Sequence, residues 1–140
     1  MEPPLQRLDD WPTLLADAIK AASGRPFSWG EHDCALFAAD VCLAITGHDP
    51  LAHVRGAYSS AFGAALTLRR LGCNDVAELA DQVIGPRERI EAAQRGDWVL
   101  SPDDEARALG VCLGPRSAFL APVGMTTRLT LDCSACWKIG

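Results

Sequence analysis

A cysteine that directly follows an aspartate, at the start of an apolar stretch, could do chemistry by its type and position. Asp33 is a favourable N-cap residue, because its carboxylate can accept hydrogen bonds from the free N–H groups of a first helical turn. Cys34 then takes the first position of the helix, where the helix dipole favours a thiolate. The pair predicts a cysteine nucleophile presented by a helix N-terminus, although a small buried cysteine can occupy the same position.

A cysteine nucleophile needs a partner that accepts its proton and later protonates the leaving group. The sequence contains three histidines. His32 lies two residues before Cys34 and could fold back over the sulfur, so it is the candidate base; it could equally be a loop residue bonded to the backbone. His48 lies beyond the far end of the same helix, roughly 20 Å away at about 1.5 Å per residue. His53 lies in a segment without periodicity.

The spacing of apolar residues predicts the helices that position this pair. The Cys34 helix shares one apolar face and ends near Gly47. Three further helices are predicted by a cap residue and a glycine stop: one from Asp9 or Asp10 to Gly24, one from Ser59 or Ser60 to Gly72, and a short one from Asn74 to Gly85.

The sequence pattern changes from helical periodicity to short apolar segments after residue 95. These segments predict strands at 96–100, 109–113, 117–121, 126–131 and 135–139. Helices followed by an antiparallel meander indicate an α+β domain, with N-terminal helices packed on a C-terminal antiparallel sheet. Residues 51–58 have no clean period. Within them, Arg55 and Tyr58 are interpreted as anchors that hydrogen-bond the segment to the body, or as a rim over the Cys34 region.

Composition limits the class of protein. With 140 residues, of which 49% are hydrophobic and 22% charged, the chain can form one domain over 1–140 with its own core. A net charge of −5 disfavours general binding to nucleic acid or an anionic membrane. No apolar run is long enough to span a bilayer, and no signal peptide is recognisable at Met1. We therefore expect the six cysteines to be reduced thiols in a protein made in a cytoplasm.

Cys133 and Cys136 have the spacing of a metal-ligand pair. A structural zinc site needs four ligands, and Cys73 and Cys112 would complete it only if the fold brought them together. We therefore expect no metal and no other cofactor. A small metal-binding assembly factor remains an alternative function.

Several short motifs follow one another in a recognisable order. Trp-Gly and then Asp33-Cys34 are followed by Gly-Asp-Trp-Val at 96–99 and Leu-Gly-Val-Cys-Leu-Gly at 109–114. This order resembles the NlpC/P60 group of papain-like cysteine peptidases, which cleave peptides in bacterial cell walls. The chain is also similar to a small family encoded in phage and prophage tail modules. That likeness is carried by residues 26–30, 32–34, 46–50, 55–58 and 135–140.

The resemblance implies that Cys34 is the nucleophile position and that the catalytic histidine should stand at the start of the second core strand, where this chain has Ala108. The third polar residue should fall near 117–120, where only Ser117 is polar. The implied protein is an NlpC/P60-like domain without its base.

Its implied role is that of a structural component of a phage tail tip or baseplate, in a multi-chain assembly with other tail-tip proteins. It would be located in the virion tail and made in the cytoplasm of the bacterial host. The alternative is an active cysteine peptidase or amidase that cleaves peptidoglycan stem peptides during phage entry, with His32 as the first candidate for its base.

Overall fold

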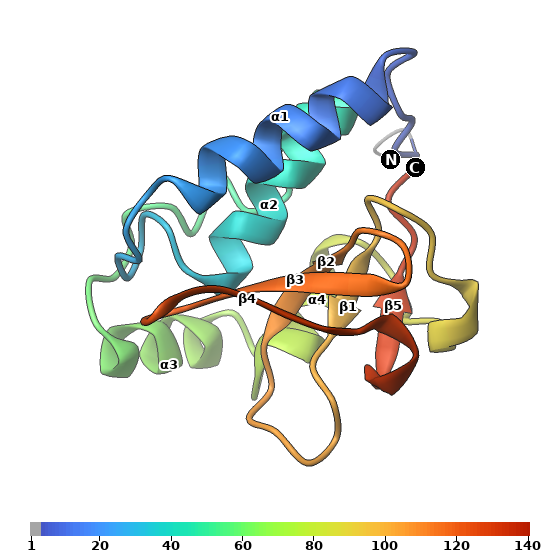
Figure 1. Ribbon diagram of the computed structural model, residues 1–140. Helices are drawn as coiled ribbons and strands as arrows, with labels where there is room; N and C mark the ends of the chain where they lie inside the picture. Colours follow the sequence, from blue (N-terminus) through green and yellow to red (C-terminus); the bar gives the residue numbers. More distant parts are fainter. Residues whose placement is uncertain (1–3) are drawn as a thin grey trace.

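The computed structural model describes residues 4–140. In this part of the chain, four α-helices precede a sheet of five antiparallel strands, which confirms the predicted α+β class (Figure 1). The helices are α1 Trp11–Ser23, α2 Cys34–Thr46, α3 Ala61–Arg70 and α4 Val76–Val83. The strands are β1 Trp98–Leu100, β2 Leu109–Cys112, β3 Arg116–Ala121, β4 Gly124–Leu129 and β5 Ala135–Trp137.

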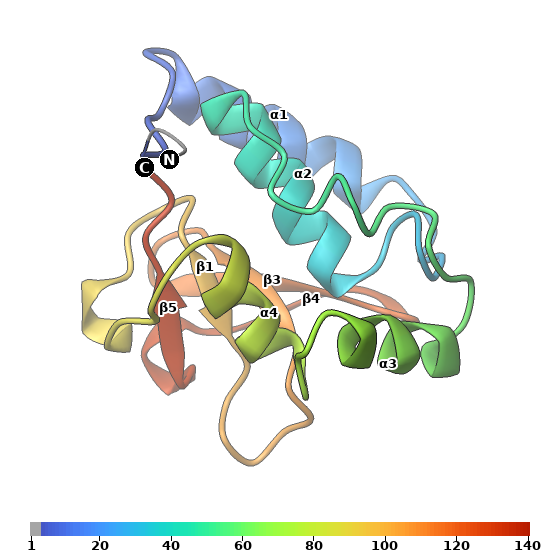
Figure 2. The ribbon, with the colours of Figure 1, turned by 180° about the vertical axis from the view of Figure 1, so that it is seen from behind.

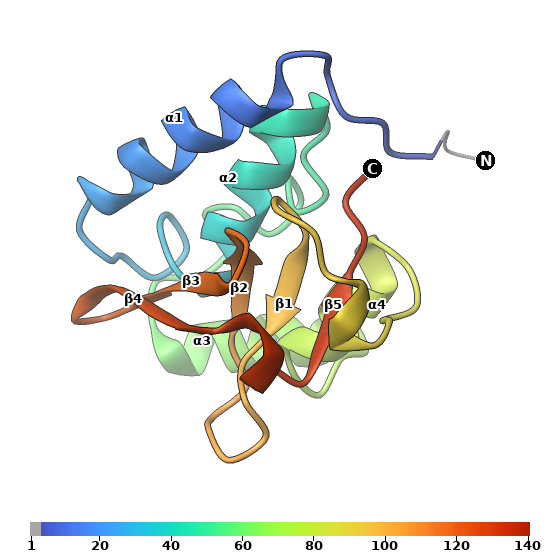
Figure 3. The ribbon, with the colours of Figure 1, turned by 45° about the vertical axis from the view of Figure 1, so that its right-hand side comes forward.

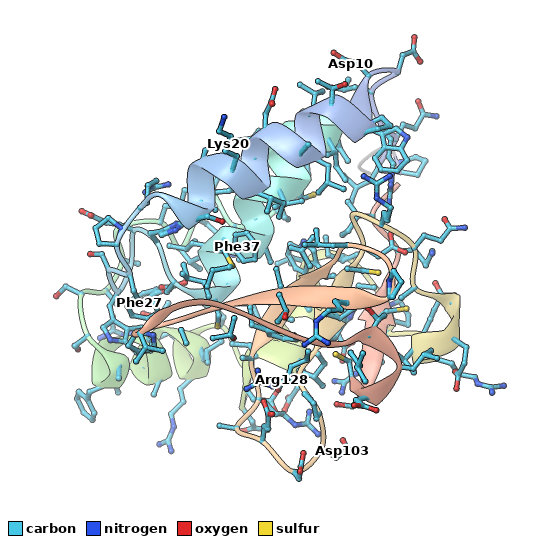
Figure 4. All side chains as sticks on the ribbon, in the orientation of Figure 1. Asp10, Lys20, Phe27, Phe37, Asp103 and Arg128 are labelled. Carbon is cyan, nitrogen blue, oxygen red and sulfur yellow. The ribbon has the colours of Figure 1, made fainter. Side chains whose placement is uncertain are left out.

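Helix α2 lies between α1 and the sheet (Figures 1 and 2). Eight of its residues are buried, so its apolar surface extends beyond the single predicted face. Phe37, which is fully buried, lies where α2 meets the sheet (Figure 4). The helix ends at Gly47 as predicted, because Gly47 takes a left-handed conformation, with φ 79°, and its N–H binds the Leu43 carbonyl at 2.8 Å.

The strands lie in the order β4-β3-β2-β1-β5, and the helices pack on one face of this sheet (Figure 3). Two fully buried tryptophans fix that packing. The indole N–H of Trp98 donates to the Ala38 carbonyl of α2 at 2.9 Å, and that of Trp137 donates to Asp81 Oδ1 of α4 at 3.0 Å. Buried indoles need such partners, so each tryptophan joins a strand to a specific helix.

The opposite face of the sheet is covered by two short 3₁₀ turns, η1 Ile90–Ala92 and η2 Thr130–Asp132. This second cluster contains Val99, Cys112 and Phe119. Because side chains alternate along a strand, these residues point away from α2.

Several predicted boundaries change. Helix α4 is capped by Asp75, not Asn74, because the Asp75 carboxylate accepts the Glu78 N–H at 2.9 Å. The fourth strand begins at Gly124 and ends at Leu129, since Thr130 already belongs to η2. Residues 51–58 form successive turns, in keeping with their lack of period.

A fully buried carboxylate, Asp97, fastens both ends of the chain to the sheet. Asp97 Oδ1 accepts hydrogen bonds from Arg7 Nη2 and from the Ile139 backbone N–H, both at 2.9 Å. Its other oxygen accepts from Lys138 Nζ and from the Gln94 backbone N–H. A buried carboxylate is tolerated here because charged and backbone donors satisfy both oxygens.

Candidate functional site

The candidate site is built around the first turn of α2. Asp33 has extended backbone angles, and its Oδ1 accepts the Leu36 N–H at 3.0 Å, so it is the N-cap that the sequence predicts. Cys34 is consequently the first residue of the helix. The predicted location of this cysteine is confirmed.

The second carboxylate oxygen of Asp33 joins two distant segments. Asp33 Oδ2 accepts the Gly30 N–H at 3.0 Å and the Tyr58 hydroxyl at 2.5 Å. Asp33 is only 2% exposed, and these bonds replace the water that its charge loses on burial. One carboxylate therefore caps α2, fixes the approach loop and holds the turn segment 51–58.

The backbone also holds Tyr58 in place. Gly30 has φ +82°, and a Cβ there would lie 1.9 Å from the Tyr58 carbonyl oxygen. Only glycine permits this close approach and this left-handed conformation together. The Gly30 carbonyl in turn accepts the Gly56 N–H at 2.9 Å.

Arg55 fastens the same segment to α2. Its guanidinium lies 2.7 Å from Asp40 Oδ1, and its Nε donates to Asp49 Oδ2 at 2.7 Å. Arg55 and Tyr58 therefore act as the hydrogen-bonding anchors that the sequence suggested, and Tyr58 also lines the space beside Cys34.

The Cys34 thiol does not have the character expected from a helix N-terminus. Burial, with a smaller contribution from the Asp33 carboxylate, raises its pKa from 9.0 to about 11. Backbone hydrogen bonds from Leu109 and Ala35 oppose this shift without reversing it. In this geometry desolvation outweighs the helix dipole that favours a thiolate, and the sulfur is a neutral thiol near pH 7.

Tyr58 is held in its neutral form as well. Burial, the hydrogen bond to Asp33 and the nearby negative charge together raise the pKa of the phenol above its ordinary value of 10.0. Tyr58 is therefore a permanent donor to Asp33 at physiological pH.

A partly open cavity of about 50 Å³ lies beside Cys34. The cysteine, Trp29 and Tyr58 line one side of it. The first turn of α2 lies next to α3 and α4 (Figures 1 and 2), and these helices and their connection supply the other wall: Ala64, Thr67, Leu68, Leu71, Val76 and Leu79. The arrangement can hold a small apolar group against a neutral thiol.

The candidate base, His32, does not line this cavity. Its ring is buried; Nε2 lies 3.0 Å from the Ala22 carbonyl oxygen at the end of α1, within hydrogen-bond distance. Nδ1 has no hydrogen-bond partner among the described residues and lies 4.0 Å from Asp40 Oδ2. The other two histidines are also outside the cavity lining, with His48 just after α2 and His53 exposed in the turn segment.

The two positions that the resemblance assigns to the base and to the third polar residue lie near β2 and β3. Ala108 directly precedes β2, and its side chain packs against the second cluster, on the face away from α2. Ser117 is fully buried in β3 opposite Cys112, and its hydroxyl lies 2.7 Å from Thr130 Oγ1. Neither side chain lines the Cys34 cavity.

Cys133 and Cys136 are both buried, and each thiol donates to a backbone carbonyl, of Leu129 and Arg89 respectively. Burial raises both pKa values to about 11. Within residues 4–140, no three His, Cys, Asp or Glu side chains are grouped so that they could hold a metal ion.

Sequence reasoning missed the wall formed by α3 and α4. A signal was present, because Ala64, Thr67, Leu68 and Leu71 recur at helical spacing on one side of α3 and its end. Their pattern predicts a buried face of the helix. In the structure no residue of α3 is buried, because this face lines the partly open cavity.

Residues 6–139 match the sequence model of a family described as a domain of unknown function, DUF6950. The chain belongs to the DUF6950 family. The match covers all the helices and strands described above, including the Asp33–Tyr58 contact. No curated protein and no solved structure matches this DUF6950 chain significantly. Over the described range 4–140, its helices are all too short or too polar to cross a membrane.

Proposed function

We propose that this chain is a catalytically silent, NlpC/P60-like component of a bacteriophage tail tip or baseplate. The observation that carries the lack of catalysis is the surroundings of Cys34: its thiol pKa is about 11, and no histidine is among the described residues that line the cavity beside it. A neutral thiol without an imidazole has no group that transfers a proton to a leaving amine.

Exposed apolar side chains support a role in a multi-chain assembly. Phe62 on α3, Val123 in the β3–β4 turn and Leu131 in η2 are 75%, 91% and 72% exposed. Contiguous exposed apolar patches mark interaction surfaces, and we expect neighbouring chains to cover these side chains in the assembly. The partners in this proposal are other tail-tip proteins.

The assembly role is tested in the phage or prophage that carries the gene. We expect mass spectrometry of purified tails to contain the chain, and chemical cross-linking to connect it to neighbouring tail-tip proteins. We expect Cys34→Ala to leave tail assembly and infectivity unchanged. Purified tails that lack the chain would refute the role.

The catalytic part of the proposal is tested with peptidoglycan stem peptides. We expect no hydrolysis by the wild-type chain or by Cys34→Ala. Ala108→His should also be inactive, because residue 108 lies on the face of the sheet away from α2, so the new imidazole would not reach Cys34. Loss of a base in a nucleophilic enzyme costs several orders of magnitude in rate. Hydrolysis by the wild type that disappears in Cys34→Ala would establish the alternative, an active peptidase or amidase. His32→Ala would then test whether His32 supplies the base.

A further inference from the structure

The cavity beside Cys34 excludes charged groups by its chemistry. Its lining is mostly aliphatic and aromatic, and the polar side chains of Asp33, Tyr58 and Thr67 already have hydrogen-bond partners. Asp33 accepts from Tyr58, and the Thr67 hydroxyl donates to the Gly63 carbonyl at 2.8 Å. The Asp33 charge would repel an anion, and a cation would lose its hydration beside a carboxylate whose oxygens already accept three hydrogen bonds.

The cavity also selects by size. Its volume of about 50 Å³ exceeds the roughly 10–15 Å³ that one water molecule needs and is well below the roughly 150 Å³ that encloses benzene. It accommodates the end of an aliphatic side chain but not a whole drug-sized ligand. Because the cavity is partly open, the rest of a ligand can lie outside it.

Helix α3 gives this cavity an adaptable wall. None of its residues is buried, although Ala64, Thr67 and Leu68 face the cavity. A helix with so little buried surface can shift at low cost to admit a group. On its outer side, Phe62 and Leu66 are 75% and 37% exposed, so α3 also presents apolar side chains to solvent.

We propose that the cavity beside Cys34 is a docking site for an uncharged aliphatic side chain, of valine or leucine type, presented by a partner protein. The side chain enters between Tyr58 and α3, and the partner's adjoining residues lie over α3. This inference rests on the proposed function in one respect only, that the partner is a neighbouring tail protein. The selectivity of the cavity for aliphatic groups does not depend on that role and can be measured on the isolated chain.

The selectivity is tested by NMR titration of the isotopically labelled chain with capped amino acids. N-acetyl-leucinamide and N-acetyl-valinamide should shift the methyl signals of Leu68 and Leu79 saturably, with a Kd on the order of millimolar for a ligand of this size. The capped lysine and glutamate amides should bind at least about tenfold more weakly, because an ammonium would have to displace the donors that already bind Asp33 and a carboxylate would be repelled by it. Absence of saturable shifts, or equal binding of all four compounds, would overturn the proposal.

Two neighbouring alanines provide a matched pair of variants. Ala64 lines the cavity, whereas Ala65 is exposed on the same helix. Ala64→Leu should fill the space and raise the Kd for N-acetyl-leucinamide about tenfold or more; Ala65→Leu should leave it unchanged. Equal Kd values for the wild type and a folded Ala64→Leu would contradict the site.

A second route covers the case in which circular dichroism shows Ala64→Leu unfolded. Methyl methanethiosulfonate converts the Cys34 thiol to a methyl disulfide and releases methanesulfinate, which adds a small group beside the cavity. Binding of N-acetyl-leucinamide should then be lost, and retained binding would overturn the proposal. Purified tails that lack the chain would refute the assembly role, but they would not change the binding of N-acetyl-leucinamide in either of these titrations.

Discussion

The Tyr58 hydroxyl donates a 2.5 Å hydrogen bond to Asp33, the residue that caps the Cys34 helix. This contact joins the turn segment 51–58 to the start of α2 across 25 positions of sequence. It makes Tyr58 a wall of the Cys34 cavity and supplies Asp33 with a third donor, beside the N–H groups of Gly30 and Leu36.

Replacing Gly30 by alanine should be far more destabilising than the same change at Gly56. Both glycines have positive φ, +82° and +73°, so each alanine adds conformational strain of about 1–2 kcal/mol. At Gly30 the new Cβ would also meet the Tyr58 carbonyl oxygen at 1.9 Å, whereas at Gly56 nothing lies within 4 Å. Urea denaturation should give a loss for Gly30→Ala at least ~2 kcal/mol larger. Equal losses would show that Tyr58 is not held against residue 30.

Asp33→Ala should cost more stability than Asp75→Ala, although each removes an N-cap. Both carboxylates accept a backbone N–H of their own helix, at 3.0 and 2.9 Å. Loss of a cap alone costs about 1 kcal/mol. Asp33→Ala also leaves the Gly30 N–H and the Tyr58 hydroxyl without their acceptor, which adds about 1–3 kcal/mol. Thermal and urea unfolding of the two variants measure the difference, and a cost at Asp33 no greater than at Asp75 would contradict the shared role.

The free energy of unfolding should fall as the pH rises from about 9 to 11. In the unfolded chain the thiols ionise near pH 9.0, while in the folded chain the pKa of Cys34 is about 11 because the thiol is desolvated. The folded state therefore holds its proton longer, so this stability is fully present below pH 9 and is lost as the pH rises toward the folded pKa. Urea titrations at pH 8, 9.5 and 11 should show a decline that Cys34→Ala reduces by about 2 kcal/mol, since the pKa difference between 9.0 and about 11 acts over most of this range. The same decline in both proteins would mean that Cys34 does not contribute.

Asp97→Ala should be among the most destabilising single changes. The carboxylate is fully buried and binds Arg7, Lys138 and two backbone N–H groups, so its removal leaves buried donors unpaired. We expect a loss of about 3–5 kcal/mol by chemical denaturation. Glu105→Ala is the control, because Glu105 pairs with Arg128 on the surface at 2.8 Å and such pairs contribute about 0–1 kcal/mol. Comparable losses for the two variants would refute the role of Asp97.

Local interactions were predictable from the sequence. The Asp33 cap depends on residues within one helical turn, and the Gly47 stop on a conformation that glycine adopts readily. The order of helices and strands follows from periodicities of a few residues, and these also gave the α+β class. The sequence did not determine whether Asn74 or Asp75 caps α4, because the two neighbouring side chains offer similar acceptors and the backbone conformation decides between them.

The character of the site was decided by tertiary structure. Helix position favours a thiolate at Cys34, but the pKa of the thiol depends on what buries it, and the elements that do so lie far along the chain. The direction of the His32 ring depends on the end of α1, where the Ala22 carbonyl lies beside Nε2. Both the exclusion of solvent from the thiol and the long-range hydrogen bonds depend on residues that are distant in sequence. The sequence therefore determined where Cys34 stands, and only the packed structure determined its charge, its neighbours and the cavity beside it.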